Sequence, residues 1–301
     1  MINVSIIIVN FNTSKLTCEC IDSIIKHTEG INYEIIVVDN NSHDDSLKRF
    51  KRYKKKKEIN FKLIANSKNY GFGYANNQGI EACDPSSGYV LFLNSDTKLF
   101  SNVVKKMFVI LEKRKDIGVI SCQLLNKDGS IQQNGGYFPT LIRVFSWMII
   151  QDLPYVDKII KPFHPKTNNF YNVERDLDWV TGAFFMVRKS VIDQCGMFDT
   201  DYFMYAEDTD YCYRIRKAGW RILYTPSAAI IHYGGASGEN WSFVCREFEG
   251  IKTFYKKHYP KWQLPILKLL LKIGSLLRFI FYTVKINPLA AQSYVKAFSQ
   301  A

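Results

Sequence analysis

The sequence predicts an α/β fold: a Rossmann-like, mostly parallel central sheet flanked by helices, followed by a C-terminal helical extension. Through roughly the first 120 of 301 residues, short and continuously apolar runs alternate with stretches of helical period. Strands of a parallel sheet are buried on both faces, which is why such runs are continuously apolar. Polar, acidic segments directly follow two of these runs, at residues 37–42 and 91–97. In open α/β sheets ligands bind at the carboxyl ends of strands, so these segments mark a candidate site.

The elements up to residue 125 follow one another in a regular order. We expect strands at residues 4–11, 34–39, 61–65, 89–93 and 118–125, and helices at residues 14–27, 42–57, 74–82 and 102–114. In the first helix Leu16, Cys20 and Ile24 recur every four residues and form one apolar face. Each helix lies between two strands, as the crossover connections of a parallel sheet require.

The stretch 126–177 is less regular. It holds four prolines and a possible helix around 141–150, and we interpret it as an excursion that faces the substrate. Regular structure returns with a strand at 179–187, a helix from Lys189, a helix at 207–218 and strand-like segments at 221–224 and 228–232. We therefore expect one α/β domain over residues 1–240 and a helical extension over residues 241–301.

The extension contains a long apolar segment at residues 265–284. It is long enough to suggest a membrane span, but Lys268, Lys272 and Arg278 interrupt it. At ~100° per residue these cations and Lys285 fall within one sector of roughly 140°. This pattern favours a helix in the membrane interface, with its cations toward lipid phosphates. Packing on the protein's own core or on a second subunit, in a homodimer, remains an alternative, and true spanning is the least favoured one.

The charge balance predicts an anionic partner. Lys and Arg number 40 against 28 Asp and Glu, for a net charge of +12, while 47% hydrophobic and 23% charged residues exclude a disordered class. Eight of the ten residues at 48–57 are basic. Such a run is most often a solvated helix face, and anionic lipid is the next interpretation. No nucleic-acid recognition motif accompanies it, so we expect no nucleic-acid partner.

Seven scattered cysteines, without a Cys-x-x-Cys pair, favour a reducing compartment. The N-terminal segment has no basic leader and is typical of a buried strand. These features predict a cytoplasmic protein, peripheral at the inner face of the cell membrane.

Three segments carry carboxylates that point to chemistry. Asp39 follows the second strand, Asp96 follows the fourth, and Glu207, Asp208 and Asp210 begin a helix, where the macrodipole favours negative charge. Each segment alone has a structural explanation, as a turn, a helix cap or ordinary helix charge. The occurrence of all three segments, in this order along the chain, indicates a functional site more strongly than any one segment does.

Other enzyme classes lack their motifs here. A dinucleotide oxidoreductase needs Gly-x-Gly-x-x-Gly after the first strand, but that strand ends in Asn10-Phe11-Asn12. The Gly-x-Ser-x-Gly of an α/β-hydrolase and the P-loop are absent as well. The opening Gly-rich, Arg-containing loop of sugar-phosphate nucleotidyltransferases is also missing.

The motif order resembles family-2 inverting glycosyltransferases of the GT-A fold. The likeness runs from VSIIIVNFN through EIIVVDNNS, NYGFGYANNQG, YVLFLNSDT, WVTGAFFMVRKS and FMYAEDTDYCYR to IIHYGGAS, over about residues 3–238. It is closest to the rhamnosyltransferase-like branch that builds bacterial cell-surface polysaccharides. The resemblance implies dTDP-rhamnose as leading donor, with UDP-hexoses as the alternative, and a hydroxyl of a glycan or lipid-linked glycan as acceptor.

The resemblance also implies site residues. The nucleotide-sugar set is Asn10, Asp39, Asn66, Asn76, Asn94, Ser95, Asp96, Trp179 and Gly182, with Asn10 and Asp39 at the base and ribose. Asp96 matches the last residue of an Asp-x-Asp metal motif whose first position is Asn94 here. With His232 it implies a divalent cation, Mg²⁺ or Mn²⁺. Asp208 matches the catalytic base, and Glu207 and Asp210 orient it or bind acceptor hydroxyls.

Sugar transfer with inversion is consistent with these residue types. A single in-line displacement at the anomeric carbon needs one base to remove the proton of the acceptor hydroxyl, and positive charge beside the leaving diphosphate. Asp208 supplies the former, and a cation held by Asp96 and His232 supplies the latter.

Overall fold

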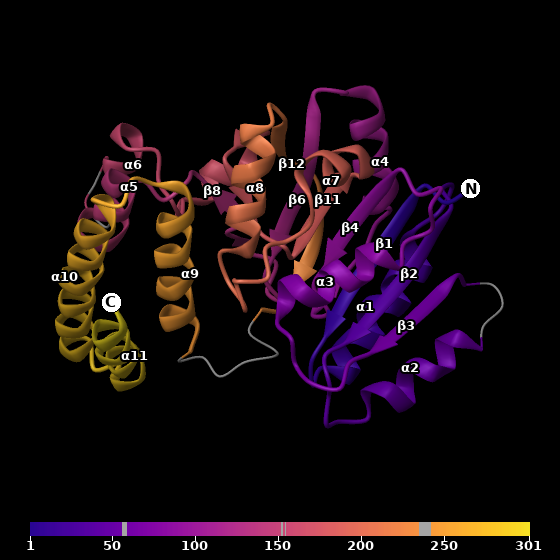
Figure 1. Ribbon diagram of the computed structural model, residues 1–301, viewed down its shortest axis with the longest axis horizontal. Helices are drawn as coiled ribbons and strands as arrows, with labels where there is room; N and C mark the ends of the chain where they lie inside the picture. The colour runs from indigo at the N-terminus through magenta and orange to yellow at the C-terminus, as the bar shows by residue number, and fades with distance from the viewer. Residues whose placement is uncertain (56–58, 152, 154, 235–241) are drawn as a thin grey trace.

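The central sheet confirms the predicted α/β class. The structure, a computed structural model, describes residues 1–55, 59–151, 153, 155–234 and 242–301 (Figure 1). The main path of the sheet has the order β3-β2-β1-β4-β11-β6-β12-β5. Its strands are β1 (Val4–Asn10), β2 (Tyr33–Asp39), β3 (Phe61–Ala65), β4 (Tyr89–Leu93), β5 (Thr97–Lys98), β6 (Ile117–Leu125), β11 (Phe184–Arg188) and β12 (Arg221–His232). The pairs β1–β2, β1–β4, β2–β3 and β6–β12 are parallel, whereas β11 is antiparallel to both β4 and β6.

Short strands extend this sheet. β7 (Ile131–Gln132) pairs with β6, and β9 (Arg175–Leu177) pairs with β12. A separate two-stranded ribbon joins β8 (Gly135–Gly136) to β10 (Trp179–Val180).

Helices cover both faces of the sheet and also pack beyond its edge. They are α1 (Ser14–His27), α2 (Ser46–Lys54), α3 (Phe72–Glu81), α4 (Val103–Lys113), α5 (Leu141–Phe145), α6 (Val156–Ile159), α7 (Lys189–Cys195), α8 (Glu207–Lys217), α9 (Ser242–His258), α10 (Gln263–Val284) and α11 (Pro288–Gln300). Successive residues of β1 point to opposite faces: Ile6 and Ile8 join the core under α1, α2 and α4, and Ile7 joins the core with α3, α7 and α8.

Several elements differ from their predicted bounds. The expected strand at 179–187 is divided into β10 and β11, because Gly182 lies in a turn between them and its N–H donates to Asp208. The segments expected at 221–224 and 228–232 form one strand, β12, whose register shifts between Thr225 and Ala229. α2 begins only at Ser46, because Asp44 accepts hydrogen bonds from Ser14 and Ser46 and holds the preceding residues in a loop. Lys56 and Lys57 of the basic run lie outside the described residues.

The irregular stretch contains the helix expected around 141–150, in two parts. α5 continues into a π-helical turn at Ser146–Ile150, and a 3₁₀ turn follows at Asn168–Asn172. α10 packs against this segment: Leu267, Leu271 and Gly274 are on its inner side, and a Cβ on Gly274 would clash with Met148.

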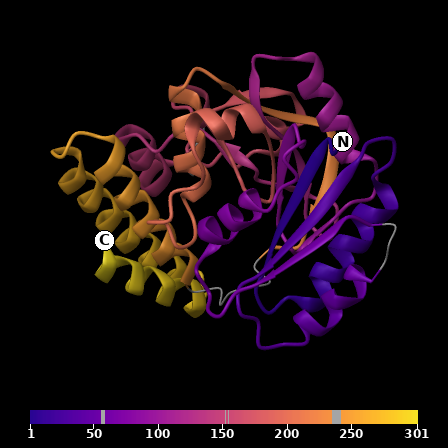
Figure 2. The ribbon, with the colours of Figure 1, turned by 45° about the vertical axis from the view of Figure 1, so that its right-hand side comes forward.

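The C-terminal helices α9, α10 and α11 pack together at the end of the molecule opposite α2 and β3 (Figures 1 and 2). Within the described part of the chain, no helix is long and apolar enough to cross a membrane. The boundary proposed between residues 240 and 241 falls in the segment 235–241, outside the described residues.

Candidate active site

A cavity of about 830 Å³ opens where the predicted motifs meet. Its walls come from the segments after β1, β2 and β4, the start of α3, the turn between β10 and β11, the start of α8, the end of β12 and the first turns of α9. The lining residues include Asn94, Ser95, Asp96, Gly182, Glu207, Asp208 and His232. The fold therefore brings together seven of the predicted site residues.

Asp96 and His232 form one pair in this cavity. β5 pairs with β12 so that Thr97 lies opposite His232, and His232 Nε2 is 3.3 Å from Asp96 Oδ1. Gln132 Oε1 lies 2.6 Å from His232 Nδ1 and can only accept, so Nδ1 carries the proton. Nε2 faces Asp96 and the amide of Asn94, whose Nδ2 is 3.2 Å away, and in the neutral imidazole this nitrogen carries the lone pair. A hydrogen bond that fixes the tautomer in this way is typical of a metal-ligating histidine.

These two side chains can hold a divalent cation together with ligands from a substrate. In the described part of the chain, no group of three or more His, Cys, Asp or Glu side chains is arranged for a metal ion. Mg²⁺ in nucleotide enzymes is commonly held by one or two protein side chains while phosphate oxygens complete its coordination. Asp96 and His232 fit that arrangement, and the amide group of Asn94 lies beside them with its nitrogen toward His232.

Asp208 and Glu207 form a second acidic group in the same cavity. The N–H groups of Gly182 and Thr209 donate to the Asp208 carboxylate at 3.2 and 2.7 Å, which fixes its orientation. Burial raises the pKa of Asp208 to about 6. Burial, and next the charge of Asp208, also raise the pKa of Glu207. Among the described residues Glu207 Oε2 has no hydrogen-bond partner, so this carboxyl is available to a ligand.

The start of α8 is held by α9. Tyr205 and Ala206 have positive φ angles of 71° and 67°, which turn the chain into the helix directly before Glu207. A Cβ on Gly250 of α9 would lie 2.7 Å from Tyr205 O and from Ala206 Cβ. Glycine is therefore required for this close approach, and the C-terminal extension is part of the structure that positions Asp208.

The predicted base and ribose residues lie behind the wall of the cavity. Asn10 and Asp39 are fully buried, and Asn10 Nδ2 donates to Asp39 Oδ1 at 2.7 Å. Asn76 donates to Phe72 O, and Asn66 donates to Asn40 Oδ1. None of these four side chains lines the cavity, whereas Asn40 does. Two of them hold Asn40 in place: Asn10 O accepts from the Asn40 N–H, and Asn66 Nδ2 donates to Asn40 Oδ1.

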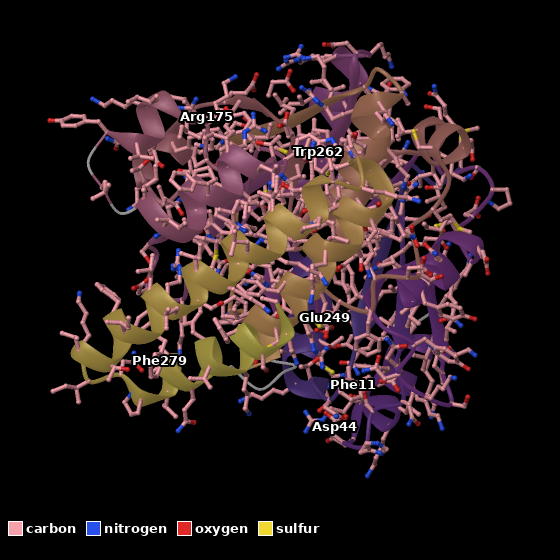
Figure 3. The ribbon with its side chains drawn as sticks, turned by 60° about the vertical axis from the view of Figure 1, so that its left-hand side comes forward. Phe11, Asp44, Arg175, Glu249, Trp262 and Phe279 are labelled. Atoms are coloured by element: carbon pink, nitrogen blue, oxygen red, sulfur yellow. The ribbon has the colours of Figure 1, made fainter. Side chains whose placement is uncertain are left out.

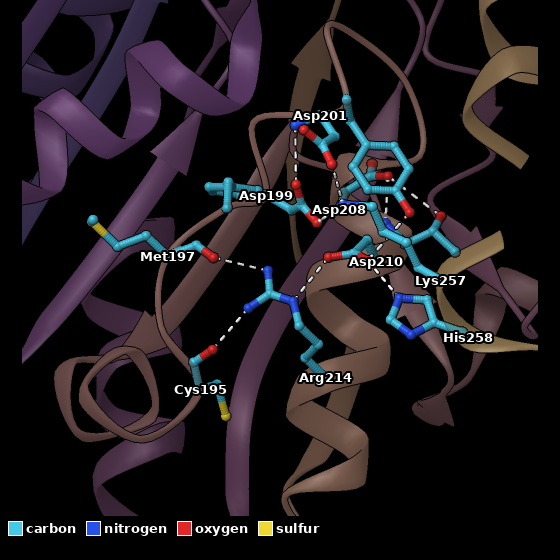
Figure 4. Close-up of polar contacts among 12 residues, drawn as sticks. Cys195, Met197, Asp199, Asp201, Asp208, Asp210, Arg214, Lys257 and His258 are labelled. Carbon is cyan, nitrogen blue, oxygen red and sulfur yellow. Dashed lines mark hydrogen bonds and ion pairs between the residues drawn. The ribbon is translucent and has the colours of Figure 1, made fainter. Parts of the chain in front are cut away.

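Trp179 and Asp210 also differ in placement from the prediction. Trp179 packs against Phe163 and His164 and does not line the cavity. Asp210 is fully buried on the far side of α8, where Arg214 Nε at 2.9 Å and His258 Nε2 at 2.6 Å contact its carboxylate (Figure 4). Burial alone would raise the pKa of Asp210, but His258 and Arg214 outweigh it and hold the pKa below its usual value. The predicted acceptor-binding role of Asp210 is therefore wrong: its carboxylate joins α8 to α9 through Arg214 and His258.

Removing this buried carboxylate should destabilise the fold. Asp210→Ala leaves Arg214 and His258 without their common partner, and we expect the free energy of unfolding to fall by about 3 kcal/mol. Asp210→Asn keeps an acceptor oxygen and should lose less. Urea denaturation followed by circular dichroism measures both, and an alanine variant as stable as the parent chain would contradict the structural role.

The cavity also contains residues that the sequence did not indicate. Phe203, Tyr205 and Phe243 place aromatic rings at one side, and Arg246 lies 5.2 Å from the Phe203 ring centroid. In the described part of the chain no carboxylate pairs with Arg246. Gln132, which orients His232, comes from the irregular stretch, and Arg246 comes from the extension. Neither lies in a motif, because each reaches the cavity only through long-range packing.

The fold and this site are those of a glycosyltransferase-type α/β protein. Asp96 and His232 can ligate a metal ion, and the buried carboxylate of Asp208 lies in the same cavity. The sequence profile described as Glycosyl transferase family 2 matches residues 5–196. The chain therefore belongs to glycosyltransferase family 2, and its fold is GT-A, as the motifs predicted.

Curated relatives include two bacterial rhamnosyltransferases. The N-acetylglucosaminyl-diphospho-decaprenol L-rhamnosyltransferase of Mycobacterium tuberculosis is 27% identical over 191 residues, which cover 58% of this chain and 59% of the relative. Rhamnosyltransferase WbbL of Escherichia coli is 30% identical over 184 residues, which cover 60% and 66%. The low-salt glycan biosynthesis hexosyltransferase Agl10 of Haloferax volcanii is 27% identical over 234 residues, which cover 76% and 67%. The matched region thus spans less than two thirds of the two rhamnosyltransferases.

Solved structures share the fold at low identity. The mannosyltransferase PcManGT from Pyrobaculum calidifontis, in complex with GDP-Man and Mn²⁺, has a TM-score of 0.60 at 16% identity and covers 98% of this chain and 73% of that one. GalNAc-T7 with UDP, GalNAc and Mn²⁺ has a TM-score of 0.64 at 16% identity, covering 91% and 51%. The likeness to PcManGT covers nearly the whole chain and therefore includes the C-terminal helices.

Proposed function

We propose that this protein is an inverting glycosyltransferase that moves a sugar from a nucleoside-diphosphate donor to a hydroxyl of a glycan or lipid-linked glycan. The observation that carries the proposal is the Asp208 carboxylate, oriented by two backbone N–H groups, in the same cavity as the Asp96–His232 pair. Two acidic centres of different kinds in one cavity match the two requirements of the reaction, a base and a site for the leaving diphosphate.

Asp208 is the base of this mechanism. Its carboxylate accepts the proton of the acceptor hydroxyl while that oxygen forms a bond to the anomeric carbon. The bond from the anomeric carbon to the diphosphate oxygen breaks at the opposite side, and its electron pair leaves with the diphosphate. A pKa near 6 leaves the carboxylate ionised at neutral pH and makes it a stronger base than an ordinary aspartate.

Asp96 and His232 would hold Mg²⁺ or Mn²⁺ at the diphosphate. When bound, the cation supplies positive charge to the leaving group. Gln132 accepts a hydrogen bond from Nδ1 of His232 and so holds the imidazole with Nε2 directed at this position. Glu207, buried and with an unpartnered oxygen, is proposed to contact a sugar hydroxyl beside the base.

The leading donor is dTDP-rhamnose, and a UDP-hexose is the second candidate. The rhamnosyltransferases among the relatives support the first, and the hexosyltransferase Agl10 supports the second. We further propose that the protein takes part in surface polysaccharide synthesis at the cytoplasmic face of the cell membrane. Residues 1–240 form the glycosyltransferase domain in this proposal, and residues 241–301 form the extension.

A screen of dTDP-rhamnose, UDP-glucose and GDP-mannose with simple glycoside acceptors tests the donor, and NMR of the product tests inversion. Failure of every nucleotide sugar, both to transfer and to shift the melting temperature, would refute the proposal.

The pH dependence of transfer should report on Asp208. At saturating Mn²⁺ we expect kcat/KM to fall about tenfold per pH unit below a break near pH 6, because protonation removes the base. A break near the ordinary aspartate value of 3.8 would show that the base lies in a more solvated environment than that of Asp208.

A further inference from the structure

The outward side of α10 is apolar. A stripe of large apolar side chains recurs at spacings of three and four residues, each between 40% and 76% exposed: Ile266, Leu269, Ile273, Leu276, Leu277, Ile280, Phe281 and Val284. The opposite side, with Leu267, Leu271 and Gly274, is buried against the rest of the molecule. A helix on the surface of a globular protein normally carries polar side chains on its outward side.

The apolar stripe extends along the end of the molecule formed by the C-terminal helices. Trp262 directly precedes α10, and the labels of Trp262 and Phe279 in Figure 3 show the course of this helix. α11 packs on α10 and adds the exposed side chains of Leu289, Val295 and Phe298. Contiguous exposed apolar surface of this kind marks an interaction site.

The charge around the apolar stripe is of one sign. After Glu249 the sequence has nine Lys and Arg residues and no Asp or Glu. At ~100° per residue, Lys272 and Lys285 fall on either flank of the apolar stripe, and both are exposed. Arg278 differs from the sequence-based expectation: its guanidinium donates to Trp147 O and lies 5.7 Å from the Tyr294 ring, so it faces the protein and not solvent.

This charge distribution favours a lipid bilayer over a second copy of the chain as the partner of the apolar stripe. A two-fold contact between copies of the chain would place the apolar stripe against itself. It would bring the flanking lysines of both copies together, with no carboxylate after Glu249 to pair with them. A bilayer with anionic headgroups provides apolar depth for the stripe and negative charge for the lysines at its edges.

We infer that the apolar stripe of α10, with its flanking lysines and the exposed face of α11, is the docking surface for an anionic lipid bilayer. α9 packs on both helices and carries Phe243 and Arg246 into the cavity, so it connects the docked surface to the site. The use of this surface to present a lipid-linked acceptor rests on the proposed function. Docking itself does not.

Co-sedimentation with vesicles tests the inference without donor or glycan. We expect the full chain to bind phosphatidylcholine vesicles containing phosphatidylglycerol, and to bind pure phosphatidylcholine more weakly. Ile273→Gln/Ile280→Gln should weaken binding more than about tenfold. The matched pair Phe100→Gln/Val173→Gln, which changes comparably exposed apolar residues outside the extension, should bind as the parent does.

The charge is tested in the same assay. Lys272→Gln/Lys285→Gln should lower binding about 30-fold, since each lysine near an anionic surface contributes about fivefold. Lys48→Gln/Lys51→Gln on α2, at the other end of the molecule, is the charge control and should bind as the parent does. Equal binding to both lipids, parental binding by the α10 variants, or an equal loss in the α2 variant would each overturn the inference.

Sedimentation equilibrium without lipid addresses the second copy. We expect the same mass for the parent and for Ile273→Gln/Ile280→Gln, and a dimer dispersed by these substitutions would assign the stripe to a protein interface instead. Transfer to a water-soluble acceptor should be unchanged in all of these variants. Failure of lipid binding with intact transfer would therefore reject the docking surface and leave the proposed activity standing.

Discussion

Asp208→Asn is expected to reduce sugar transfer about 10³-fold while donor binding is retained. Loss of a general base typically costs 10²- to 10⁴-fold, and the amide cannot accept the hydroxyl proton. The substitution keeps the size of the side chain and one oxygen for the N–H of Gly182 or Thr209, so the cavity should keep its shape. Transfer is measured as kcat, and donor affinity is measured by calorimetry with the nucleotide sugar and Mn²⁺.

Asp210→Asn is the matched control for this variant. It makes the same chemical change two residues further along α8, at a carboxylate that pairs with Arg214 and His258 and does not line the cavity. We expect it to retain transfer per folded molecule. Near-parental kcat in Asp208→Asn, or equal losses in both variants, would remove Asp208 from the role of base.

Asp96→Ala is expected to weaken Mn²⁺ binding in the presence of nucleoside diphosphate by more than about 100-fold. Substitution of residues that only orient a metal ligand typically costs 10- to 100-fold, and loss of a ligand should exceed that. Transfer should fall with it, because the leaving diphosphate then lacks its counter-charge. Electron paramagnetic resonance of Mn²⁺ measures the binding independently of turnover.

Gln132→Ala provides a graded comparison for Asp96→Ala. It removes the partner of His232 Nδ1 and leaves Asp96 and His232 in place, so we expect a loss of about 10-fold in Mn²⁺ affinity. Unchanged Mn²⁺ affinity in Asp96→Ala would place the cation elsewhere. A loss in Gln132→Ala as large as in Asp96→Ala would mean that the tautomer of His232 controls the site.

The carboxylates of the candidate site could be found from local pattern. Asp96 lies three residues after the end of an apolar strand, and Asp208 lies in the first turn of a helix, so the sequence places both at the ligand-binding edge of a parallel sheet. Asp39 and Asp210 carry the same local signal, yet both are fully buried in hydrogen bonds within the protein. Local pattern identifies a polar residue at the end of an element but not which neighbours will neutralise it.

Helix α10 of the C-terminal extension shows the same limit for apolar residues. Its periodicity predicted an apolar face for α10 but not whether that face is buried. The structure buries Leu267 and Leu271 and leaves Ile273 and Ile280 exposed, because α5, α9 and α11 occupy only one side of the helix.

Local pattern was sufficient to predict the α/β class, the order of most elements, the family and the carboxylates beside the strand ends. The spacing of apolar residues and the polar residues that follow strands are local properties, so they can be recognised in the sequence. Tertiary structure alone decided that Gln132 orients His232, that Gly250 allows α9 to support the turn before Asp208, and that Arg246 enters the cavity. These contacts join segments as much as 100 residues apart, and only packing around a common sheet brings them together.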